Sequence, residues 1–251
     1  MPSEPNSTGP TSPDSALRVL IGVCTLNEAD NIVPLVTRLR LAIPEADVLV
    51  IDDESSDNTA ELVTQMVEKD PSVMIIVRHD ARGLGSAIRH AMTYAIDHGY
   101  GYFLNLDGDL SHDPEQLPSL LERAKQSPPV DVVIGSRYVS GGSIVGWPIH
   151  RKLMSRMVNL FATSFLRLPV KDCSGSMRCY RVDALASVGM STLHSNGYAV
   201  LEELLVRLHR QDSQMAEVPI TFTDRREGKS KLTLREAIRS TSQMLAMALR
   251  H

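Results

Sequence analysis

Two aspartates that flank a single glycine are the clearest candidates for chemistry in this sequence. Asp107 and Asp109 follow an apolar stretch directly, with Gly108 between them, and residues i and i+2 of an extended backbone point to the same side. Their carboxylates would repel each other unless a hard divalent cation lay between them. Mg²⁺ or Mn²⁺ binds such oxygen ligands together with substrate phosphates. A polar turn is the alternative, but the motif follows a strand of the buried type, and we therefore predict a metal site.

A second acidic pair ends another apolar stretch. Asp52 and Asp53 precede Asp57 and Asn58, and a helix cap would account for either of the latter two residues. It would not account for two acids at the end of a strand. A carboxylate in that position can accept hydrogen bonds from a nucleoside, as it does in dinucleotide-binding folds. Nucleoside binding is therefore the prediction for Asp53, and a purely structural role is the alternative.

A glycine-rich segment and three arginines are weaker candidates for phosphate binding. Residues 83–87 read GLGSA, but they follow the third predicted strand, whereas the dinucleotide-binding fingerprint follows the first. We therefore exclude an oxidoreductase and assign these glycines to close packing at the start of a helix. Arg137, Arg178 and Arg225 are candidate phosphate ligands, because a guanidinium group donates parallel hydrogen bonds to an oxyanion. An ordinary ion pair is the alternative for each of them.

The elements that would carry these residues are short apolar strands that alternate with helices. The predicted strands are 18–24, 48–52, 73–78, 101–106 and 130–135, and the predicted helices are 29–41, 58–69, 85–98 and 114–126. Several strands are nearly continuous in Val, Ile and Leu, as strands buried on both faces are. The alternation predicts an α/β fold with a mostly parallel central sheet and helices on both faces.

Polar residues that follow the strands should then meet at one edge of the sheet, because ligands of such sheets bind at the carboxyl ends of the strands. The residues concerned are Thr25, Asn27, Glu28, Asp52, Asp53, 78–82, Asp107, Asp109, Ser136 and Arg137. Their types suit a nucleotide diphosphate.

Length and composition are typical of one large soluble domain. The 251 residues contain no uncharged apolar run of about 18 residues, so no transmembrane helix is expected. Residues 1–17 are rich in Pro and Ser, lack the features of a signal peptide, and are expected to form a disordered tail. The three cysteines have no metal-binding spacing, and Cys24 is predicted to pack in the core of a cytoplasmic protein.

Two basic segments contrast with the net charge of −4. Residues 150–171 contain five Lys or Arg and no acid, and residues 225–251 contain seven Lys or Arg and two Glu. Both carry apolar residues at helical spacing, within 152–168 and in a predicted C-terminal helix over 233–251. Such basic amphipathic helices can lie in a membrane interface, although packing on the domain core would explain the same pattern. The charge suits a phosphate ligand or an anionic membrane surface.

Taken in order, the motifs resemble those of glycosyltransferase family 2 and, within it, the dolichyl-phosphate (polyprenyl-phosphate) mannose synthases. The matching segments are TLNEADNI (25–32), VIDDESSDNT (50–59), GLGSA (83–87), LDGDLSHDP (106–114), VIGSRYVSGG (133–142), DCSGSMRCYR (172–181), GYAVLEE (197–203) and EVPITFTDRREGKSK (217–231). The resemblance implies a GT-A type fold over 18–232, a nucleotide-sugar donor and a divalent metal, Mg²⁺ or Mn²⁺. The chain departs from the family at the residue before Asn27, usually aromatic, at Gly108, commonly Ala, and at the extra acid Glu202.

The resemblance also implies roles for individual residues. Those implied to bind the nucleoside are Thr25, Asn27, Glu28 and Asp53. Asp107 and Asp109 would serve the metal and the donor diphosphate. The residues implied to meet donor or acceptor phosphates are Ser136, Arg137 and Arg225, with Lys231 nearby. Glu203 would orient groups around the sugar, and the four residues implied to act in catalysis are Asp109, Arg137, Glu203 and Arg225.

The implied reaction is inverting transfer of mannose from GDP-mannose to a polyprenyl (dolichyl-type) phosphate by a peripheral enzyme at the cytoplasmic face of the membrane. The acceptor needs no strong general base, because a phosphate monoester with a second pKa near ~6 is largely dianionic at neutral pH. The expected partners are the donor, the lipid phosphate and the membrane surface, and not a nucleic acid. Two alternatives stay open: a family 2 transferase with another nucleotide sugar, such as UDP-glucose, or a non-lipid acceptor, and a non-catalytic nucleotide-sugar-binding subunit.

Overall fold

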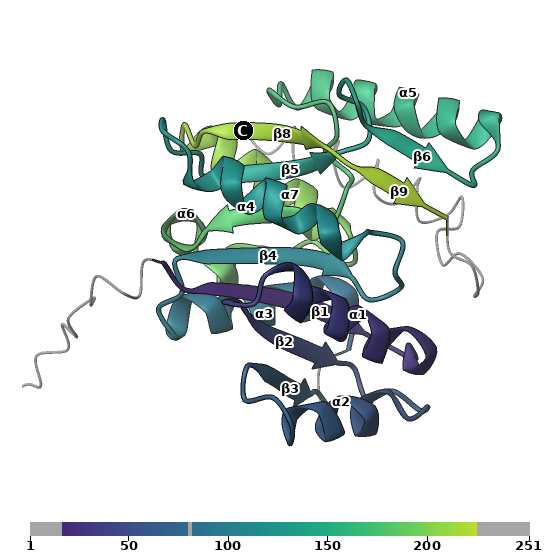
Figure 1. The fold of residues 1–251 in the computed structure, drawn as a ribbon. Coiled ribbons are helices and arrows are strands. Elements are labelled where there is room, and N and C mark those ends of the chain that lie inside the picture. The colour runs from purple at the N-terminus through teal and green to yellow at the C-terminus, as the bar shows by residue number, and fades with distance from the viewer. Residues whose placement is uncertain (1–16, 80–81, 225–251) are drawn as a thin grey trace, which may run out of the picture.

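The central sheet of the protein has seven strands in the order β3-β2-β1-β4-β7-β5-β8 (Figure 1). The computed structural model describes residues 17–79 and 82–224. The strands of this sheet are Val19–Thr25 (β1), Asp47–Asp52 (β2), Val73–Val77 (β3), Tyr102–Asp107 (β4), Val132–Ser136 (β5), Arg178–Arg181 (β7) and Met215–Pro219 (β8). β7 is antiparallel to its neighbours β4 and β5, and the remaining pairs are parallel. All five predicted strands are confirmed, with ends shifted by one or two residues.

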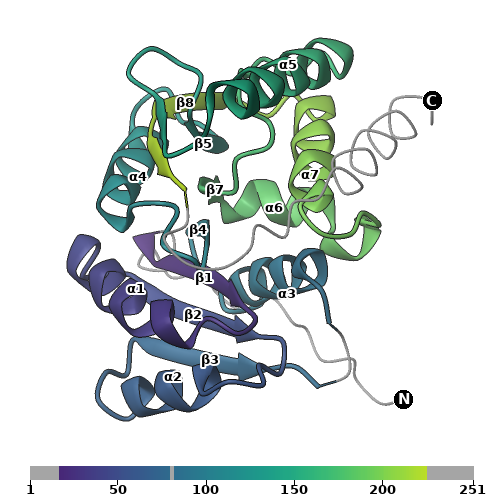
Figure 2. The ribbon, with the colours of Figure 1, turned by 90° about the vertical axis from the view of Figure 1, so that its right-hand side faces the viewer.

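Helices cover both faces of this sheet, as predicted (Figure 2). One face packs against α1 (Ala29–Ala42), α2 (Thr59–Val67) and α4 (Leu117–Lys125). The other packs against α3 (Leu84–Asp97), α6 (Val182–Val188) and α7 (Ala199–Arg210). Alternate residues of β1 point to opposite faces, so that Ile21 lies in the first core and Leu20 in the second. Both sides of the strand are therefore apolar, and Cys24 packs against the second core, as predicted.

The starts of the helices follow from capping residues and glycines. Asp113 accepts a hydrogen bond from Glu115 N at 3.2 Å, so the predicted helix 114–126 begins with a 3₁₀ turn, η2 (Pro114–Gln116), that leads into α4. Gly83 precedes α3 with a φ of 118°, which favours glycine. A Cβ at Gly85 would lie 2.9 Å from Gly197 N, in the loop between η3 (Met190–Thr192) and α7. These contacts confirm that the glycine-rich segment serves the start of a helix and its close packing.

A smaller unit extends beyond the β5 and β8 end of the sheet. β6 (Ser143–Val145) and β9 (Thr221–Thr223) form a parallel two-stranded sheet, and α5 (Ile149–Phe165) runs along it at one end of the molecule (Figure 1). Trp147 Nε1 donates to Asp224 Oδ1 at 3.1 Å, and the Arg151 guanidinium lies 3.9 Å from the centre of the Trp147 ring. These contacts fix the start of α5 beside the end of β9, and α5 confirms the helical pattern predicted within 152–168.

Across the two described ranges, no helix combines the length and apolar character that a bilayer crossing would need. The predicted tail 1–17 lies outside the described residues except for Leu17. The end of the predicted domain after residue 224 and the predicted helix 233–251 also lie outside them.

Candidate active site

The carboxyl ends of β1, β2 and β4 meet at one edge of the sheet. In the parallel ladders Thr25 pairs with Asp52, and Cys24 pairs with Asp107. The loops that follow are joined as well, since Asp53 N donates to Thr25 O at 3.1 Å. The end of β5, which carries the predicted phosphate ligands, points the same way beyond β7 because both β4 and β5 are antiparallel to β7. The polar residues predicted at this edge are therefore brought together there.

The predicted metal-binding pair lies at the end of β4. Asp109 is buried, and its Oδ1 accepts hydrogen bonds from Ser111 N at 3.0 Å and from Ser111 Oγ at 2.5 Å. Asp107 is the last residue of β4, and its side chain is 16% exposed. A Cβ at Gly108 would lie 3.2 Å from Cys24 O on β1. This close approach is a physical reason for glycine at a position where the family commonly has alanine.

The side chain of His112 lies beside Asp107 and bears on whether Asp107 and Asp109 could bind a cation. Its Nδ1 lies 3.7 Å from Asp107 Oδ2, is buried, and has no hydrogen-bond partner among the described residues. Burial lowers the pKa of His112 to about 4, against an opposing effect of Asp109, so the ring is neutral at pH 7. The two carboxylates are oxygen ligands of the type that Mn²⁺ and Mg²⁺ prefer. Within 17–79 and 82–224, no group of three or more His, Cys, Asp and Glu is placed to hold a metal ion, and metal binding by Asp107 and Asp109 stays a prediction.

Asp53 lies in a buried ion pair with Arg78. Asp53 Oδ1 accepts hydrogen bonds from Arg78 Nε at 2.7 Å and from Nη2, and Oδ2 accepts one from Gly83 N at 2.7 Å. Arg78 Nη1 donates to Ser86 Oγ at 3.0 Å. The pair thus joins the end of β2 to the start of α3, which is the structural alternative that the sequence left open. Nucleoside binding by Asp53 stays a prediction.

Asp52 holds the loop that follows β2. It is fully buried, and its Oδ1 accepts a hydrogen bond from Ser55 N at 2.8 Å. Its Oδ2 accepts hydrogen bonds from Ser55 Oγ at 2.6 Å and from Thr25 Oγ1 at 3.0 Å. The hydroxyl of Thr25, predicted to bind the nucleoside, therefore serves this loop in the structure.

Asn27 and Glu28 connect the loop after β1 with the loop after β2. Asn27 has a φ of 58°, and its Oδ1 accepts a hydrogen bond from Ser56 N at 2.8 Å. Glu28 N donates to Thr59 Oγ1 at 2.9 Å, and Glu28 Oε2 accepts from Asn31 Nδ2 at 2.8 Å. The loops after β1 and β2 therefore form one hydrogen-bonded unit, next to Asp52 and Asp53. The roles predicted for these two residues at the nucleoside stay predictions.

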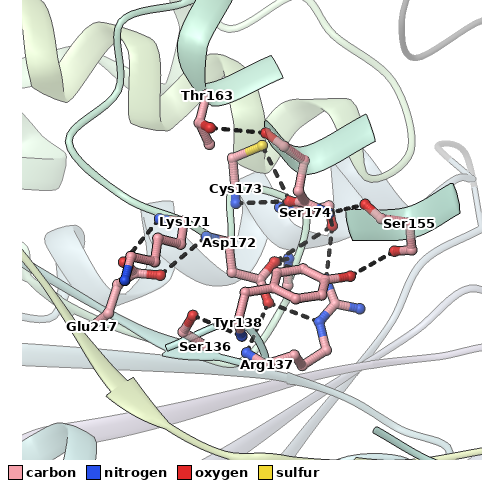
Figure 3. Close-up of polar contacts among 12 residues, drawn as sticks. Ser136, Arg137, Tyr138, Ser155, Thr163, Lys171, Asp172, Cys173, Ser174 and Glu217 are labelled. Carbon is pink, nitrogen blue, oxygen red and sulfur yellow. Dashed lines mark hydrogen bonds and ion pairs between the residues drawn. The ribbon is translucent and has the colours of Figure 1, made fainter. Parts of the chain in front are cut away.

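Arg137 is buried at the end of β5, and its guanidinium is bound to Asp172 (Figure 3). Nε donates to Asp172 Oδ2 and Nη2 to Oδ1, both at 2.7 Å, and Nη2 also donates to Ser174 Oγ at 2.7 Å. Burial alone would raise the pKa of Asp172, but the charge and hydrogen bonds of Arg137 hold it below its ordinary value. Ser136 Oγ accepts from Tyr138 N at 3.3 Å. Among the described residues, no hydrogen bond involves Arg137 Nη1, which leaves this nitrogen as a donor for a ligand.

Arg178 lies in the core, and its prediction as a phosphate ligand is wrong. It is fully buried on β7. Its Nε donates to Gly175 O at 2.8 Å, Nη1 to Leu201 O at 2.7 Å and Nη2 to Cys173 O at 2.6 Å. These backbone carbonyls use the donors that a phosphate would need, and the side chain fixes the chain around residues 173–175 instead.

Glu202 and Glu203 are both buried on α7. Burial opposes the ionisation of Glu203, but hydrogen bonds from Ser195 N at 2.8 Å and Arg207 Nη2 at 2.7 Å outweigh it and lower its pKa. Glu203 thus holds the loop before α7. Glu202 is also buried, and its charge adds to the effect of burial in raising the pKa of Cys173 to about 12. The role of Glu203 at the sugar stays a prediction.

The remaining predicted residues, Arg225 and Lys231, lie outside the described residues. Asp172 has a clear role at the site but is not among the predicted site residues, and Arg78 is predicted at this edge only as part of 78–82, without a role of its own. Asp172 begins the segment 172–181 that carries part of the family resemblance, so a signal existed for it. The partner of Arg78 could be found only from the three-dimensional neighbourhood of β2 and β3.

Comparisons with known proteins agree with this geometry. Residues 20–189 match the family model described as Glycosyl transferase family 2. The chain is 38% identical over 217 residues to an undecaprenyl-phosphate mannosyltransferase of Micrococcus luteus, with 86% of this chain and 88% of that protein covered. It is 34% identical over 225 residues to a polyprenol monophosphomannose synthase of Mycolicibacterium smegmatis, with 88% and 84% covered.

Solved structures of glucosyl-3-phosphoglycerate synthase from Mycobacterium tuberculosis share the fold. The complex with Mn²⁺, uridine diphosphate and phosphoglyceric acid superposes with a TM-score of 0.69 at 16% identity, over 93% of this chain and 78% of that chain. This likeness confirms the predicted GT-A type fold. The family model and the two relatives show that the chain is a glycosyltransferase and belongs to glycosyltransferase family 2.

Proposed function

We propose that the protein transfers mannose from GDP-mannose to a polyprenyl phosphate, with inversion at the anomeric carbon. One observation carries the proposal: the same sheet edge holds the acidic pair on β4 and the Arg137–Asp172 pair after β5, with only β7 between the two strands. The first pair suits a nucleoside diphosphate with its cation, and the second suits an acceptor phosphate. The names of the two relatives, an undecaprenyl-phosphate mannosyltransferase and a polyprenol monophosphomannose synthase, support the choice of sugar and lipid.

On the donor side, Asp107 and Asp109 would hold Mg²⁺ or Mn²⁺, with His112 beside them. The cation, when bound, would supply a Lewis acid that stabilises charge on the departing diphosphate. The chain itself supplies fixed loops around the nucleoside, since the Asp53–Arg78 pair holds the ends of β2 and β3 against the start of α3. A preformed surface of this kind lowers the cost of orienting the donor.

On the acceptor side, Arg137 would position the lipid phosphate. That phosphate is already a nucleophile, because its second pKa lies near ~6, so the protein has to orient it rather than remove a proton. Asp172 fixes the guanidinium in one orientation and neutralises its charge, which leaves directed hydrogen bonds from Nη1 as the main contribution of this side chain. Arg225 and Lys231 lie outside the described residues, and their part in phosphate binding rests on the family resemblance alone.

Helix α5 would bring this site to a membrane surface. Large apolar side chains on its outer side are 54–83% exposed, namely Ile149, Leu153, Met157, Leu160 and Phe161. They do not pack on the described core, which was the alternative for this pattern. Basic side chains stand in the first half of the same helix, namely Arg151, Lys152 and Arg156. An exposed apolar face with basic neighbours suits the interface of an anionic membrane, and we propose peripheral binding through α5.

A screen of nucleotide sugars tests the proposed reaction. The purified protein with Mn²⁺ would receive GDP-mannose or UDP-glucose, together with polyprenyl phosphate in vesicles or 3-phosphoglycerate as a soluble acceptor. We expect a mannosylated lipid from GDP-mannose alone, with inverted configuration by NMR spectroscopy of the product. Transfer from UDP-glucose or to the soluble acceptor alone would contradict the proposal, and donor binding without turnover would favour a non-catalytic subunit.

The metal assignment has its own test in Asp109→Ala. Loss of one of the two carboxylates should reduce Mn²⁺-dependent transfer by roughly a hundredfold or more, because a metal contributes several kcal/mol to charge stabilisation. Asp97→Ala, at the exposed end of α3, is the matched control and should leave turnover unchanged. Near-normal turnover of Asp109→Ala would contradict the metal site.

A further inference from the structure

We propose that Asn159, on the inner side of α5, is a positioning residue for the acceptor side of the site. It fixes the loop 172–175, and this loop fixes the guanidinium of Arg137. The inference relies on the proposed function only in taking a phosphate as the ligand of Arg137.

The carboxamide of Asn159 is buried and uses its full hydrogen-bonding capacity. Its side chain is part of a residue that is 2% exposed. Oδ1 accepts hydrogen bonds from Cys173 N at 3.1 Å and from Ser174 N at 3.3 Å, and Nδ2 donates to Ser174 Oγ and to Ser155 O, both at 3.0 Å. An Asn side chain offers two donors and two acceptor positions, so every one of them is engaged, and three of the four reach the loop.

Ser174 connects this carboxamide to the site. Its hydroxyl oxygen accepts hydrogen bonds from Asn159 Nδ2 at 3.0 Å and from Arg137 Nη2 at 2.7 Å, and Figure 3 shows Ser174 between α5 and Arg137. Asp172, two residues earlier in the same loop, accepts from Arg137 Nε, Nη2 and backbone N. One loop therefore contacts Asn159 on one side and carries both anchors of the guanidinium on the other.

Packing alone does not account for an asparagine at this position. Asn is a weaker helix former than Leu or Ala, and a buried amide gains little unless its partners are well placed. A buried polar side chain on this helix can satisfy its hydrogen bond within the helix, as Thr163 does: its hydroxyl donates to Asn159 O at 2.9 Å. Tyr138 Oη and Ser155 Oγ form a second connection, at 2.7 Å, between α5 and the residues next to Arg137.

The outer and inner sides of α5 thus face different ligands. Met157 and Leu160 are more than 60% exposed on the outer side, within two residues of Asn159. The inner side is hydrogen-bonded to the loop that orients Arg137. A lipid surface against α5 and a phosphate at Arg137 Nη1 would consequently meet one rigid unit, which places the acceptor headgroup relative to its membrane.

Kinetics on three variants test the inference. Asn159→Leu removes all the contacts at similar volume, Ser174→Ala removes only the bridging hydroxyl, and Thr163→Val is the matched control on the same helix. We expect the KM for polyprenyl phosphate to rise about tenfold in Asn159→Leu, and by less in Ser174→Ala, because a hydrogen bond to a charged group is lost or loosened. The KM for GDP-mannose should stay within about twofold of the original value in all three variants.

A spectroscopic arm is independent of the transfer reaction. The Nε–H resonance of Arg137, protected by Asp172, should shift and exchange faster with solvent in Asn159→Leu and in Ser174→Ala, and not in Thr163→Val. Should Asn159→Leu fail to fold, Ser174→Ala decides both measurements. If the unmodified protein does not use polyprenyl phosphate, the proposed function fails, and the Arg137 resonance still decides the positioning role.

Two results would overturn the inference. One is an equal rise of the KM values for both substrates, which indicates a general structural defect. The other is an unmoved Arg137 Nε–H resonance in both Asn159→Leu and Ser174→Ala, which indicates that the guanidinium does not depend on α5.

Discussion

At the scale of single residues, the site depends on buried ion pairs whose members lie far apart in the sequence. Arg137 and Asp172 are 35 positions apart, and Asp53 and Arg78 are 25 apart. Removing one member of such a pair leaves a buried charge without compensation, which typically costs about 3–5 kcal/mol. The pairs therefore couple the integrity of the site to the stability of the fold.

Asp172→Asn tests this coupling. We expect the free energy of unfolding at neutral pH to fall by about 3–5 kcal/mol. Because the pKa of Asp172 is lowered in the folded state, its contribution is present above the ordinary value of 3.8 and is lost as the pH falls through the folded value. Denaturation curves in the acid range should therefore decline less steeply for the variant. Asp183→Asn, at a side chain 91% exposed, is the control, and equal acid profiles for Asp172→Asn and the original protein would contradict the assignment.

The sequence specifies some of these residues and not others, for physical reasons. Asp107 and Asp109 could be singled out because they flank one glycine where an apolar strand ends, and their role at a metal stays a prediction. The role of Arg178 could not be predicted, since it depends on β7, a short strand with two arginines among four residues, RCYR. Because β7 lies in the middle of a sheet covered on both faces, Arg178 is fully buried there, and its guanidinium must find partners inside.

At the scale of elements, the start of α3 is limited by the backbone of another loop. A Cβ at Gly85 would lie 2.9 Å from Gly197 N and 3.0 Å from Gly197 O, and backbone atoms cannot move aside as a flexible side chain can. Alanine favours a helix by about 1 kcal/mol over glycine, yet we expect Gly85→Ala to destabilise the protein by about 1–3 kcal/mol, as overpacking does.

Chemical denaturation would measure this effect. His90→Ala, at an exposed position of the same helix, is the control and should change the stability by no more than about 0.5 kcal/mol. A Gly85→Ala variant more stable than the original protein would show that the loop before α7 can move away from α3.

The exposed face of α5 leads to a prediction about membranes. Met157→Gln with Leu160→Gln should weaken flotation with anionic vesicles, because apolar surface that would enter the interface is lost. Both side chains are more than 60% exposed, so the melting temperature should not change. Leu41→Gln on α1, at a side chain 75% exposed, is the matched control. Unchanged flotation of the double variant would count against α5 as the membrane contact.

Strands and helices could be predicted from the sequence where a single hydrophobic pattern dominated a segment. The strands β1 to β5 are apolar runs between helices with clear starts, and the structure confirms them. The second half was harder, because β6 and β9 are three residues long and β8 is a half-buried strand that ends in proline. Short edge strands of mixed polarity carry no periodic signal, and their places follow only from the sheet that they complete.

At the scale of the whole molecule, donor and cation should stabilise the fold together. If Asp107 and Asp109 hold the cation as proposed, phosphate oxygens of the donor would share it, and Mn²⁺ and GDP would each bind better when the other is present. We expect the two together to raise the melting temperature by more than the sum of their separate effects, as measured by thermal unfolding. The joint effect should vanish in Asp109→Ala, and purely additive shifts in the original protein would contradict a shared site.

The position of β5 in the sheet has a consequence for biosynthesis. Its two sheet neighbours, β7 and β8, both come later in the chain, beginning at residues 178 and 215. While the ribosome makes the segment between, β5 is an apolar strand without a hydrogen-bonding neighbour, and α5 emerges with its apolar face before the inner loop that receives Asn159. Unpaired strands and bare apolar surfaces favour aggregation. The first four strands can pair as they are made, whereas β5 has to wait for β7 and then β8, and a nearby bilayer or chaperone would shield the nascent chain during that interval.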